Sequence, residues 1–330
     1  MATFLLRRLA YLAVLVVAAT VVAYFLAATQ LNPRARYEGR NPPPPEASVD
    51  AILDSLNLND KVPVFQRFQR WTTGLLRADL GQTVDATPVG QEIDRRMWVS
   101  LRLMLVGALV GTLLGVAGGA YSAIRQYRLP DHLLTVFSFL ILSTPIVVLA
   151  VLLKNAGIGL NNVLGFTGDA KLLYTTGEMT PGLMPWSWAG ITDRLAHMVL
   201  PSLVLMAVSI AFYSRYQRSA MLDVLGSDFL RTAQAKGLRR AHALVKHGLR
   251  TALIPMATFF AYQFALLFVG ATFTEKIFGW HGMGEFFVDS ITKNDVNSVA
   301  GVTLFVAILV LIAGFLSDVI YAALDPRVRV

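Results

Sequence analysis

Six apolar runs constrain this chain more than any other feature of its sequence. They cover residues 9–28, 97–124, 133–153, 196–216, 253–273 and 299–324. An α-helix of about 20 apolar residues crosses the hydrocarbon core of a bilayer, and only helices and closed barrels satisfy their backbone hydrogen bonds there. The sequence therefore predicts an all-α, polytopic membrane protein with six transmembrane helices and with both termini on one side.

The composition agrees with this class. Hydrophobic residues make up 55% of the chain and charged residues 15%, whereas a soluble domain has about 25% charged residues. The first run follows Arg7 and Arg8, as the core of a signal peptide would, but such a core has only about 7–15 residues. We expect residues 1–28 to form an uncleaved first transmembrane helix.

The distribution of charge predicts the orientation. Residues 215–250 contain eight basic and two acidic side chains, a net charge of +6, whereas residues 29–96 hold nine of each sign. Cytoplasmic loops carry the excess of Lys and Arg, so the basic segment and both termini are predicted to be cytoplasmic and residues 29–96 extracytoplasmic. The net charge of +8 then reflects membrane topology and contact with membrane lipid, and we expect no nucleic-acid partner.

Motifs for catalysis and metal binding are absent from the sequence. It has no phosphate loop G-x-x-x-x-G-K-[ST], no H-E-x-x-H, no G-x-S-x-G and no cysteine, and its five histidines lack metal-ligand spacing. We predict no catalytic residue, metal site or cofactor in this chain. An ion-coupled carrier stays an alternative, with Asp318 and Arg102 as its starting points, although these residues and Lys154 lie close enough to the ends of their runs to reach the membrane interface.

The second apolar run carries glycines at a spacing of four residues. Gly107, Gly111, Gly115 and Gly119 fall on one side of a helix, and such a stripe lets another helix approach closely. The pattern predicts a helix-packing surface. Simple packing explains it, and an interface that slides during a transport cycle is the alternative.

Residues 228–252 are basic and rich in small residues. Phe229, Ala233 and Gly237 recur at intervals of four, which predicts a short helix with one small or apolar face and a stop at Gly237. A second helix is predicted to present an apolar face and a basic face, the first made of Ala241, Val245, Gly248, Leu249 and Ala252 and the second of Arg239, His242, Lys246 and Arg250. The second helix suits the membrane surface, whereas the small residues of the first suit close docking against another protein.

Several motifs resemble those of a known family. The pattern A-x-A-K-G at residues 233–237, followed ten residues later by His247, resembles the EAA loop of ABC-importer permeases. The stretches ADLGQTVDATPVGQEIDRR (78–96), GATFTEKIFGWHGMGE (270–285) and LDPRVR (324–329) are similar to further motifs of these permeases, in the same order. The chain is identified as a member of the peptide and nickel subfamily of ABC-importer permeases, most like the B-type subunit of oligopeptide permeases.

The resemblance implies a type I importer permease fold. Residues 1–28 would be the first transmembrane helix, 29–96 an extracytoplasmic segment, 97–324 a five-helix core with the coupling loop 217–252, and 325–330 a cytoplasmic tail. The chain would form half of an oligopeptide pathway in the cell membrane of a bacterium. A permease for nickel or another small solute stays an alternative, because the subunit fold is the same.

The resemblance also implies partners and a contact site. The partners are a homologous C-type permease subunit, an extracytoplasmic peptide-binding protein, and two ABC ATPase domains that bind the ATP and Mg. The coupling helix that contacts an ATPase comprises Phe229, Leu230, Thr232, Ala233, Ala235, Lys236, Gly237 and Leu238. We expect Ala233, Ala235 and Gly237 to dock most closely, and the sequence identifies no residue of the substrate pathway.

Overall fold

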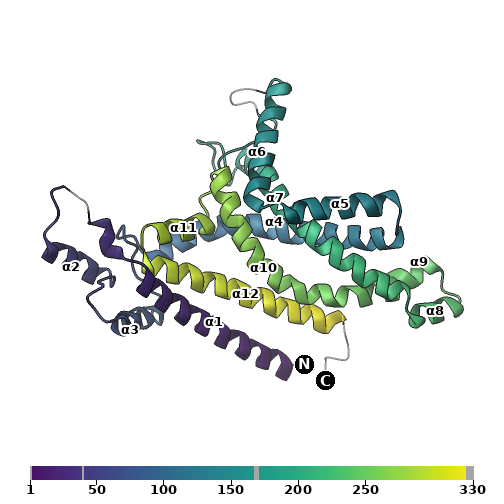
Figure 1. Ribbon diagram of the computed structural model, residues 1–330, viewed down its shortest axis with the longest axis horizontal. Helices are drawn as coiled ribbons and strands as arrows, with labels where there is room; N and C mark the ends of the chain where they lie inside the picture. Colours follow the sequence, from purple (N-terminus) through teal and green to yellow (C-terminus); the bar gives the residue numbers. More distant parts are fainter. Residues whose placement is uncertain (1, 39–40, 167–170, 325–330) are drawn as a thin grey trace. The chain divides into compact units, whose positions relative to one another are not determined.

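The computed structural model describes residues 2–38, 41–166 and 171–324, and these ranges are helical apart from turns and one isolated bridge between Gln82 and Pro88. The chain divides into two compact units: a larger unit of residues 1–9, 101–280 and 312–330, and a smaller unit of residues 10–100 and 281–311. In chain order (Figure 1) the elements are α1 (Ala2–Gln30), the 3₁₀ turn η1 (Pro33–Arg36), α2 (Glu46–Ser55), α3 (Val64–Leu75), α4 (Val89–Ile124), α5 (Leu129–Ser143), α6 (Ile146–Val163), α7 (Trp188–Leu225), α8 (Asp228–Ala235), α9 (Arg240–Ala243), the π-helical turn η2 (Leu244–Leu249), α10 (Arg250–Phe278), α11 (Met283–Thr292) and α12 (Val296–Leu324).

Among the described residues, five helices are long and apolar enough to cross a membrane. They are Leu6–Gln30, Val89–Ile124, Ile146–Val163, Trp188–Leu225 and Val296–Leu324. The helix α10 is bent by 45° between Phe260 and Gln263, and if it counts as one span the number becomes six. The prediction of an all-helical polytopic membrane protein is confirmed. The predicted tail, residues 325–330, lies outside the described residues.

The third predicted span, residues 133–153, is wrong as a single helix. α5 ends at Ser143, Thr144 has extended backbone (φ −94°, ψ 125°), and α6 begins at Ile146. Pro145 is the cause, because its ring disfavours helical backbone at the preceding residue and it has no N–H to donate. The candidate span in this region is therefore the 18-residue α6, since α5 has only 15 residues.

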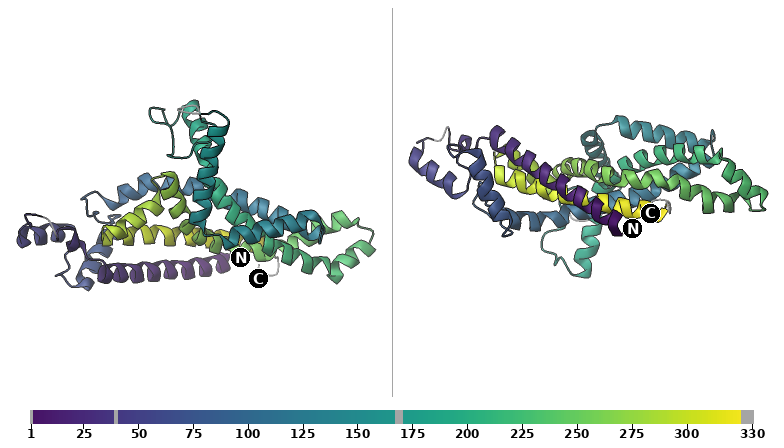
Figure 2. Two further views of the ribbon diagram at one scale, coloured as in Figure 1. Left: turned by 45° about the horizontal axis from the view of Figure 1, so that its top comes forward. Right: turned by 90° about the horizontal axis from the view of Figure 1, so that it is seen from below.

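α7 is the central helix of the larger unit. It packs against α5, α6 and α10, which the views of Figure 2 show from two further sides. Leu205, Ala211 and Tyr213 on α7 are fully buried. The hydroxyl of Ser209 on the same helix is buried too and donates to the carbonyl oxygen of Leu205 at 3.0 Å, which lowers the cost of placing it in an apolar interior.

The smaller unit has a hydrophobic core of its own. Trp71 of α3 is buried beside Tyr24 of α1, with ring centroids 5.2 Å apart. Asn297, in the first turn of α12, is fully buried and donates from its side-chain amide to the carbonyl oxygens of Leu56 and Gln82, at 2.8 and 2.9 Å. The segment 29–96 therefore shares its core with parts of α1 and α12.

Ion pairs hold the polar side of the smaller unit. The guanidinium of Arg34 lies 2.6 Å from Asp50 and 2.8 Å from Asp60. The ammonium of Lys61 lies 2.7 Å from both Glu46 and Asp50. Lys61 and Arg34 lower the pKa of Asp50, and Arg34 lowers the pKa of Asp60, because a neighbouring cation favours the charged carboxylate. The network ties η1 to the middle of α2 and to the loop that follows α2.

Candidate functional site

The short helix α8 follows α7 after two residues and ends as its sequence predicts. The N–H of Gly237 donates to the carbonyl oxygen of Gln234 at 2.9 Å, and the N–H of Leu238 donates to that of Ala233 at 3.3 Å. Gly237 has φ +90°, a conformation that costs glycine little. This is a Schellman motif, and the helix stop predicted at Gly237 is confirmed.

One side of α8 packs against its own chain. Leu230 is 2% exposed, and Ala233 and Leu238 lie beside it. They contact buried side chains from the ends of α4 and α7, from α9 and η2, and from the start of α10: Ala123, Met221, Val224, Ala243, Leu244 and Ala252. These six residues and Leu230, together with the partly buried side chains packed against them, form what we call the α8 cluster. The cluster connects α8 to every one of these elements.

The other side of α8 is open. Phe229 is 43% exposed, and Thr232, Ala235 and Lys236 are exposed as well. A Cβ atom placed on Gly237 would have nothing within 4 Å. Of the three residues expected to dock most closely, Ala235 and Gly237 are exposed, whereas Ala233 is half-buried on the same face of the helix as Leu230.

The helix predicted after Gly237 has a different register. Val245, expected on the apolar face, is 68% exposed, whereas Ala243 and Leu244, which the prediction does not place on that face, are buried. Gly248 and Ala252 are buried as predicted. The cause is the π-helical turn η2, which places more residues in one turn than an α-helix does and so rotates the following side chains. His242, Arg239 and Arg250 are exposed as predicted, and the side chains of Arg240, Ala241, Lys246 and His247 lie outside the described part of the chain.

Arg250 connects the start of α10 to the end of α12. Its Nε donates to the carbonyl oxygen of Leu324 at 3.1 Å, and its Nη2 donates to that of Ala323 at 3.3 Å. The last carbonyls of a helix lack partners within the helix and carry partial negative charge. A cation at this position stabilises them and fixes the beginning of α10 beside the α8 cluster.

The four glycines of the predicted packing surface lie against α7. A Cβ on Gly107 would lie 2.7 Å from the Cβ of Leu205, one on Gly111 2.5 Å from that of Ser209, and one on Gly115 2.8 Å from that of Tyr213. A Cβ on Gly119 would meet the backbone of Ser214. Real Cβ atoms do not come this close, so only glycine allows the observed separation of α4 and α7.

Asp318, Arg102 and Lys154, the three charged residues discussed in the sequence analysis above, all have partners. The Asp318 carboxylate lies 2.6 Å from Arg8, and the Arg102 guanidinium 2.9 Å from Glu178. The Lys154 ammonium donates to the carbonyl oxygen of Ile277 at 2.6 Å. These contacts give each charge a structural role. Within the described residues, no group of three His, Cys, Asp or Glu side chains could hold a metal ion.

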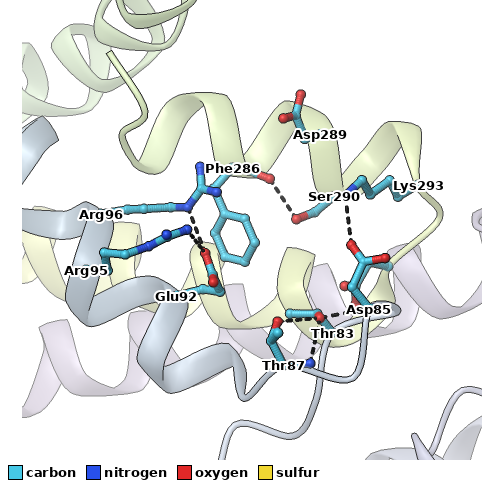
Figure 3. Close-up of a pocket in the computed structure, with 11 residues that line it drawn as sticks. Thr83, Asp85, Thr87, Glu92, Arg95, Arg96, Phe286, Asp289, Ser290 and Lys293 are labelled. Atoms are coloured by element: carbon cyan, nitrogen blue, oxygen red, sulfur yellow. Dashed lines mark hydrogen bonds and ion pairs between the residues drawn. The ribbon is translucent and has the colours of Figure 1, made fainter. Parts of the chain in front are cut away.

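A polar pocket of about 180 Å³ lies in the smaller unit, between the start of α4, the loop before it, and α11. Figure 3 shows Arg95 and Arg96 of α4 directed toward Glu92, at 2.7 and 2.9 Å. Asp85 of the loop faces Lys293 across the pocket, at 2.8 Å. Each of these five charged side chains therefore has an oppositely charged partner at the pocket.

The pocket brings together two motifs that are far apart in the sequence. Arg96 lies 5.1 Å above the ring of Phe286 and 3.7 Å from Glu285, both of α11. Lys293 and Arg36 lower the pKa of Asp85 by stabilising its carboxylate. This contact was not predictable from the two motifs, because the charge pattern along a chain does not show which segments meet.

Comparison with known proteins adds the family. Residues 115–330 match the family described as "Binding-protein-dependent transport system inner membrane component". The chain is 50% identical over 330 residues to the "Oligopeptide transport system permease protein OppB" of Mycobacterium tuberculosis (strain ATCC 25618 / H37Rv), with 100% of both chains covered. It is 33% identical over 292 residues to the "Oligopeptide transport system permease protein AppB" of Bacillus subtilis (strain 168), with 86% of each covered. It is 30% identical over 339 residues to the "Dipeptide transport system permease protein DppB" of Escherichia coli (strain K12), with 100% of this chain and 99% of the relative covered.

Proposed function

We propose that this chain, which belongs to the family of binding-protein-dependent transport system inner membrane components, is the permease subunit of an ATP-driven importer of oligopeptides. The observation that carries the proposal is the 50% identity, over the whole of both chains, to a relative named for oligopeptide transport. The other two relatives are also named for peptides, which favours peptides over nickel or another small solute as the substrate.

The chain forms half of the translocation pathway, and a homologous C-type permease forms the other half. An extracytoplasmic binding protein delivers the peptide, and two ABC ATPase domains bind ATP and Mg and drive the cycle. The family description supports this assembly, because it names transport that depends on a binding protein. Peptides differ widely in their side chains, so a wet and weakly selective pathway suits them, and selectivity then belongs to the binding protein.

The helix α8 is the coupling helix of this assembly. Its exposed side, with Phe229, Thr232, Ala235 and Lys236, is free to contact an ATPase, and its buried side is anchored in the α8 cluster. A displacement of α8 by the ATPase therefore moves the ends of α4, α7 and α10 together. Along the glycine stripe, α4 presents only hydrogen atoms to Leu205, Ser209 and Tyr213 of α7, which supports a sliding interface between these two helices.

The basic segments and both termini face the cytoplasm in this proposal, and the smaller unit carries the extracytoplasmic surface. The support is the net charge of +6 on residues 215–250 against the balanced charge of residues 29–96. Orientation and coupling agree with each other, because α8 lies within the basic segment, on the side where ATP is available.

Purification from the native membrane in mild detergent tests the function. We expect a second six-span permease and one or two ATPase subunits to accompany the chain, and peptide-loaded binding protein to stimulate ATP hydrolysis by the complex. Recovery of the chain alone, or as a homo-oligomer without an ATPase, would contradict the assembly and return attention to Asp318 and Arg102. Stimulation by nickel or another small solute, and by no peptide, would contradict the substrate.

A further inference from the structure

An ion pair between a buried carboxylate and a half-buried guanidinium connects α5 to α7 in the larger unit. The Asp131 side chain, in the first turn of α5, is 3% exposed. Its two oxygens accept hydrogen bonds from Nε and Nη2 of Arg218 on α7, at 2.6 and 2.9 Å. The hydroxyl of Ser122 and the N–H of Tyr127 donate to the same carboxylate, at 2.5 and 2.9 Å. The buried charge is therefore fully compensated.

The pair lies next to the α8 cluster. Arg218 is one turn before Met221 on α7, and Ser122 directly precedes Ala123 on α4. Met221 and Ala123 both belong to the cluster that holds Leu230 of α8. Among the described residues, α5 contributes none to that cluster, so it can follow α8 only through its contacts with α4 and α7, and the contact of Asp131 with Arg218 lies beside the cluster.

The geometry of the ion pair suits it to hold α5 in a fixed orientation relative to α7. A guanidinium that binds both oxygens of a carboxylate holds it in one relative orientation. A buried ion pair adds little net stability compared with apolar packing, but loss of one partner leaves an uncompensated charge. Two further contacts between these helices lack this fixed two-pronged geometry: the hydroxyls of Ser138 and Ser214 lie 3.0 Å apart, and the guanidinium of Arg215 lies 4.4 Å from the centroid of the Phe139 ring.

We propose that the Asp131–Arg218 pair is a positioning element that fastens the first turn of α5 to α7, so that a displacement of the coupling helix α8 moves α5 with α4, α7 and α10. The inference rests on the proposed function for the role of α8. It adds α5, which packs against α7, to the set of helices that respond to ATP.

Asp131→Asn in the assembled importer tests the pair. Asparagine is nearly isosteric and keeps one acceptor oxygen, for either Ser122 or Tyr127, but it replaces the other oxygen with an NH2 group and removes the charge that faces Arg218. We expect assembly and basal ATP hydrolysis to be retained, and stimulation by peptide-loaded binding protein to fall at least about fivefold, the lower range for coupling between sites. Ser138→Ala is the matched control, because it removes a hydroxyl contact between α5 and α7 and leaves the Asp131–Arg218 pair intact, and it should leave stimulation near the wild-type value.

A distance measurement separates positioning from general destabilisation. The chain has no cysteine, so Leu140→Cys on α5 and Arg239→Cys just beyond α8, both exposed positions, can carry a pair of spin labels. In the otherwise wild-type complex, we expect the distance between the labels to be the same without nucleotide and with ATP trapped. In Asp131→Asn, the distance should change between the two states, because α5 no longer follows α8.

Two results would overturn the inference. One is wild-type stimulation in Asp131→Asn, and the other is reduced stimulation with wild-type label distances in both states. If Asp131→Asn fails to assemble, Arg218→Lys decides in the same two assays, because lysine keeps the charge and loses the two-pronged contact. A wild-type complex that no peptide stimulates would contradict only the peptide substrate, since the distance measurement needs ATP alone.

Discussion

The side chains of four glycines on α4 are single hydrogen atoms, and this sets how closely α4 approaches α7. Membrane helices gain little from apolar burial against one another, because lipid tails are equally apolar. Their association depends instead on close van der Waals contact, which small residues allow. At Gly111 a methyl group would come within 2.5 Å of the Cβ of Ser209 and 3.2 Å of the Cα of Met206, so the backbone itself would have to move.

Gly111→Ala should therefore destabilise the protein. We expect a loss of about 1–3 kcal/mol from overpacking, seen as a lower midpoint of thermal unfolding in detergent. Gly90→Ala is the control within the same helix, because a Cβ there has nothing within 4 Å. Its midpoint should stay the same or rise, since alanine favours a helix by about 1 kcal/mol over glycine. Equal midpoints for the two variants would show that the α4–α7 contact tolerates a methyl group.

At the scale of elements, the short helix α8 depends on contacts and on a capping motif that lie outside its own hydrogen bonds. It has eight residues, too few to form a stable helix alone in water. Its anchor is Leu230 in the α8 cluster, and its stop is the Schellman motif at Gly237. The open space around Gly237 means that a substitution there acts through backbone conformation and not through a clash within the chain.

Gly237→Val and Gly237→Asn separate these two effects in the assembled complex. Valine strongly disfavours φ +90°, so it should disrupt the motif and cut peptide-stimulated ATP hydrolysis. Asparagine is tolerated better in the left-handed region and should retain more stimulation, although its side chain is larger than a hydrogen atom. Equal losses in both variants would point instead to a docking surface that excludes any side chain at residue 237, and unchanged stimulation in both would remove this position from the coupling site.

The smaller unit should resist acid down to about pH 4. Arg34, Lys61, Arg36 and Lys293 lower the folded-state pKa values of their aspartate partners. A lowered pKa stabilises the fold at every pH above the unfolded value of about 3.9, and this stabilisation is lost as the pH falls through the folded value. Hydrogen exchange in residues 46–61, corrected for the intrinsic rate at each pH, should be constant from pH 7 to pH 5 and rise below about 4.

Arg34→Gln is the control for this acid response. It removes the cation that Asp50 and Asp60 share, so exchange in residues 46–61 should already be faster at pH 7 and should depend less on pH. A decline of protection between pH 7 and pH 5 in the unmodified chain would contradict the assignment to these aspartates. A histidine would then be the group to examine.

At the scale of the whole molecule, the asymmetry of charge determines which side of the membrane each segment occupies. The basic segment 215–250 and the balanced segment 29–96 lie in different units. Moving a cluster of cations across a bilayer is costly, and the cytoplasmic leaflet attracts them. Both effects favour the orientation with α8 inside.

Two single-cysteine variants test the orientation. Gln69→Cys on α3 and Gln234→Cys on α8 are both at exposed positions and change no charge. In intact cells, a maleimide that cannot cross membranes should label the first variant and not the second, and permeabilisation should make the second reactive. The reverse pattern would place the coupling helix outside, where no ATPase could reach it, and would contradict the proposed function as well.

The candidate site was predictable from the sequence in part. The position of α8 and its stop at Gly237 were predictable, because capping depends on a few neighbouring residues. The face that α8 buries was not, because that face is chosen by Ala123, Met221 and Ala252 from three other helices. The exposure of Val245 was missed for a related reason: the π-helical turn η2 changes the helical period, and an assumed period of 3.6 residues fails there.

The sequence by itself determined that this is a helical membrane protein, because hydropathy along a run of about 20 residues suffices to place a helix in a bilayer. It also determined the basic segment and, through its motifs, the family. The tertiary structure alone decided that the glycine stripe meets α7 and that Asp131 pairs with Arg218. The physical reason is range: hydropathy and capping act between neighbours in the chain, whereas buried ion pairs and close helix contacts join residues that only the folded chain brings together.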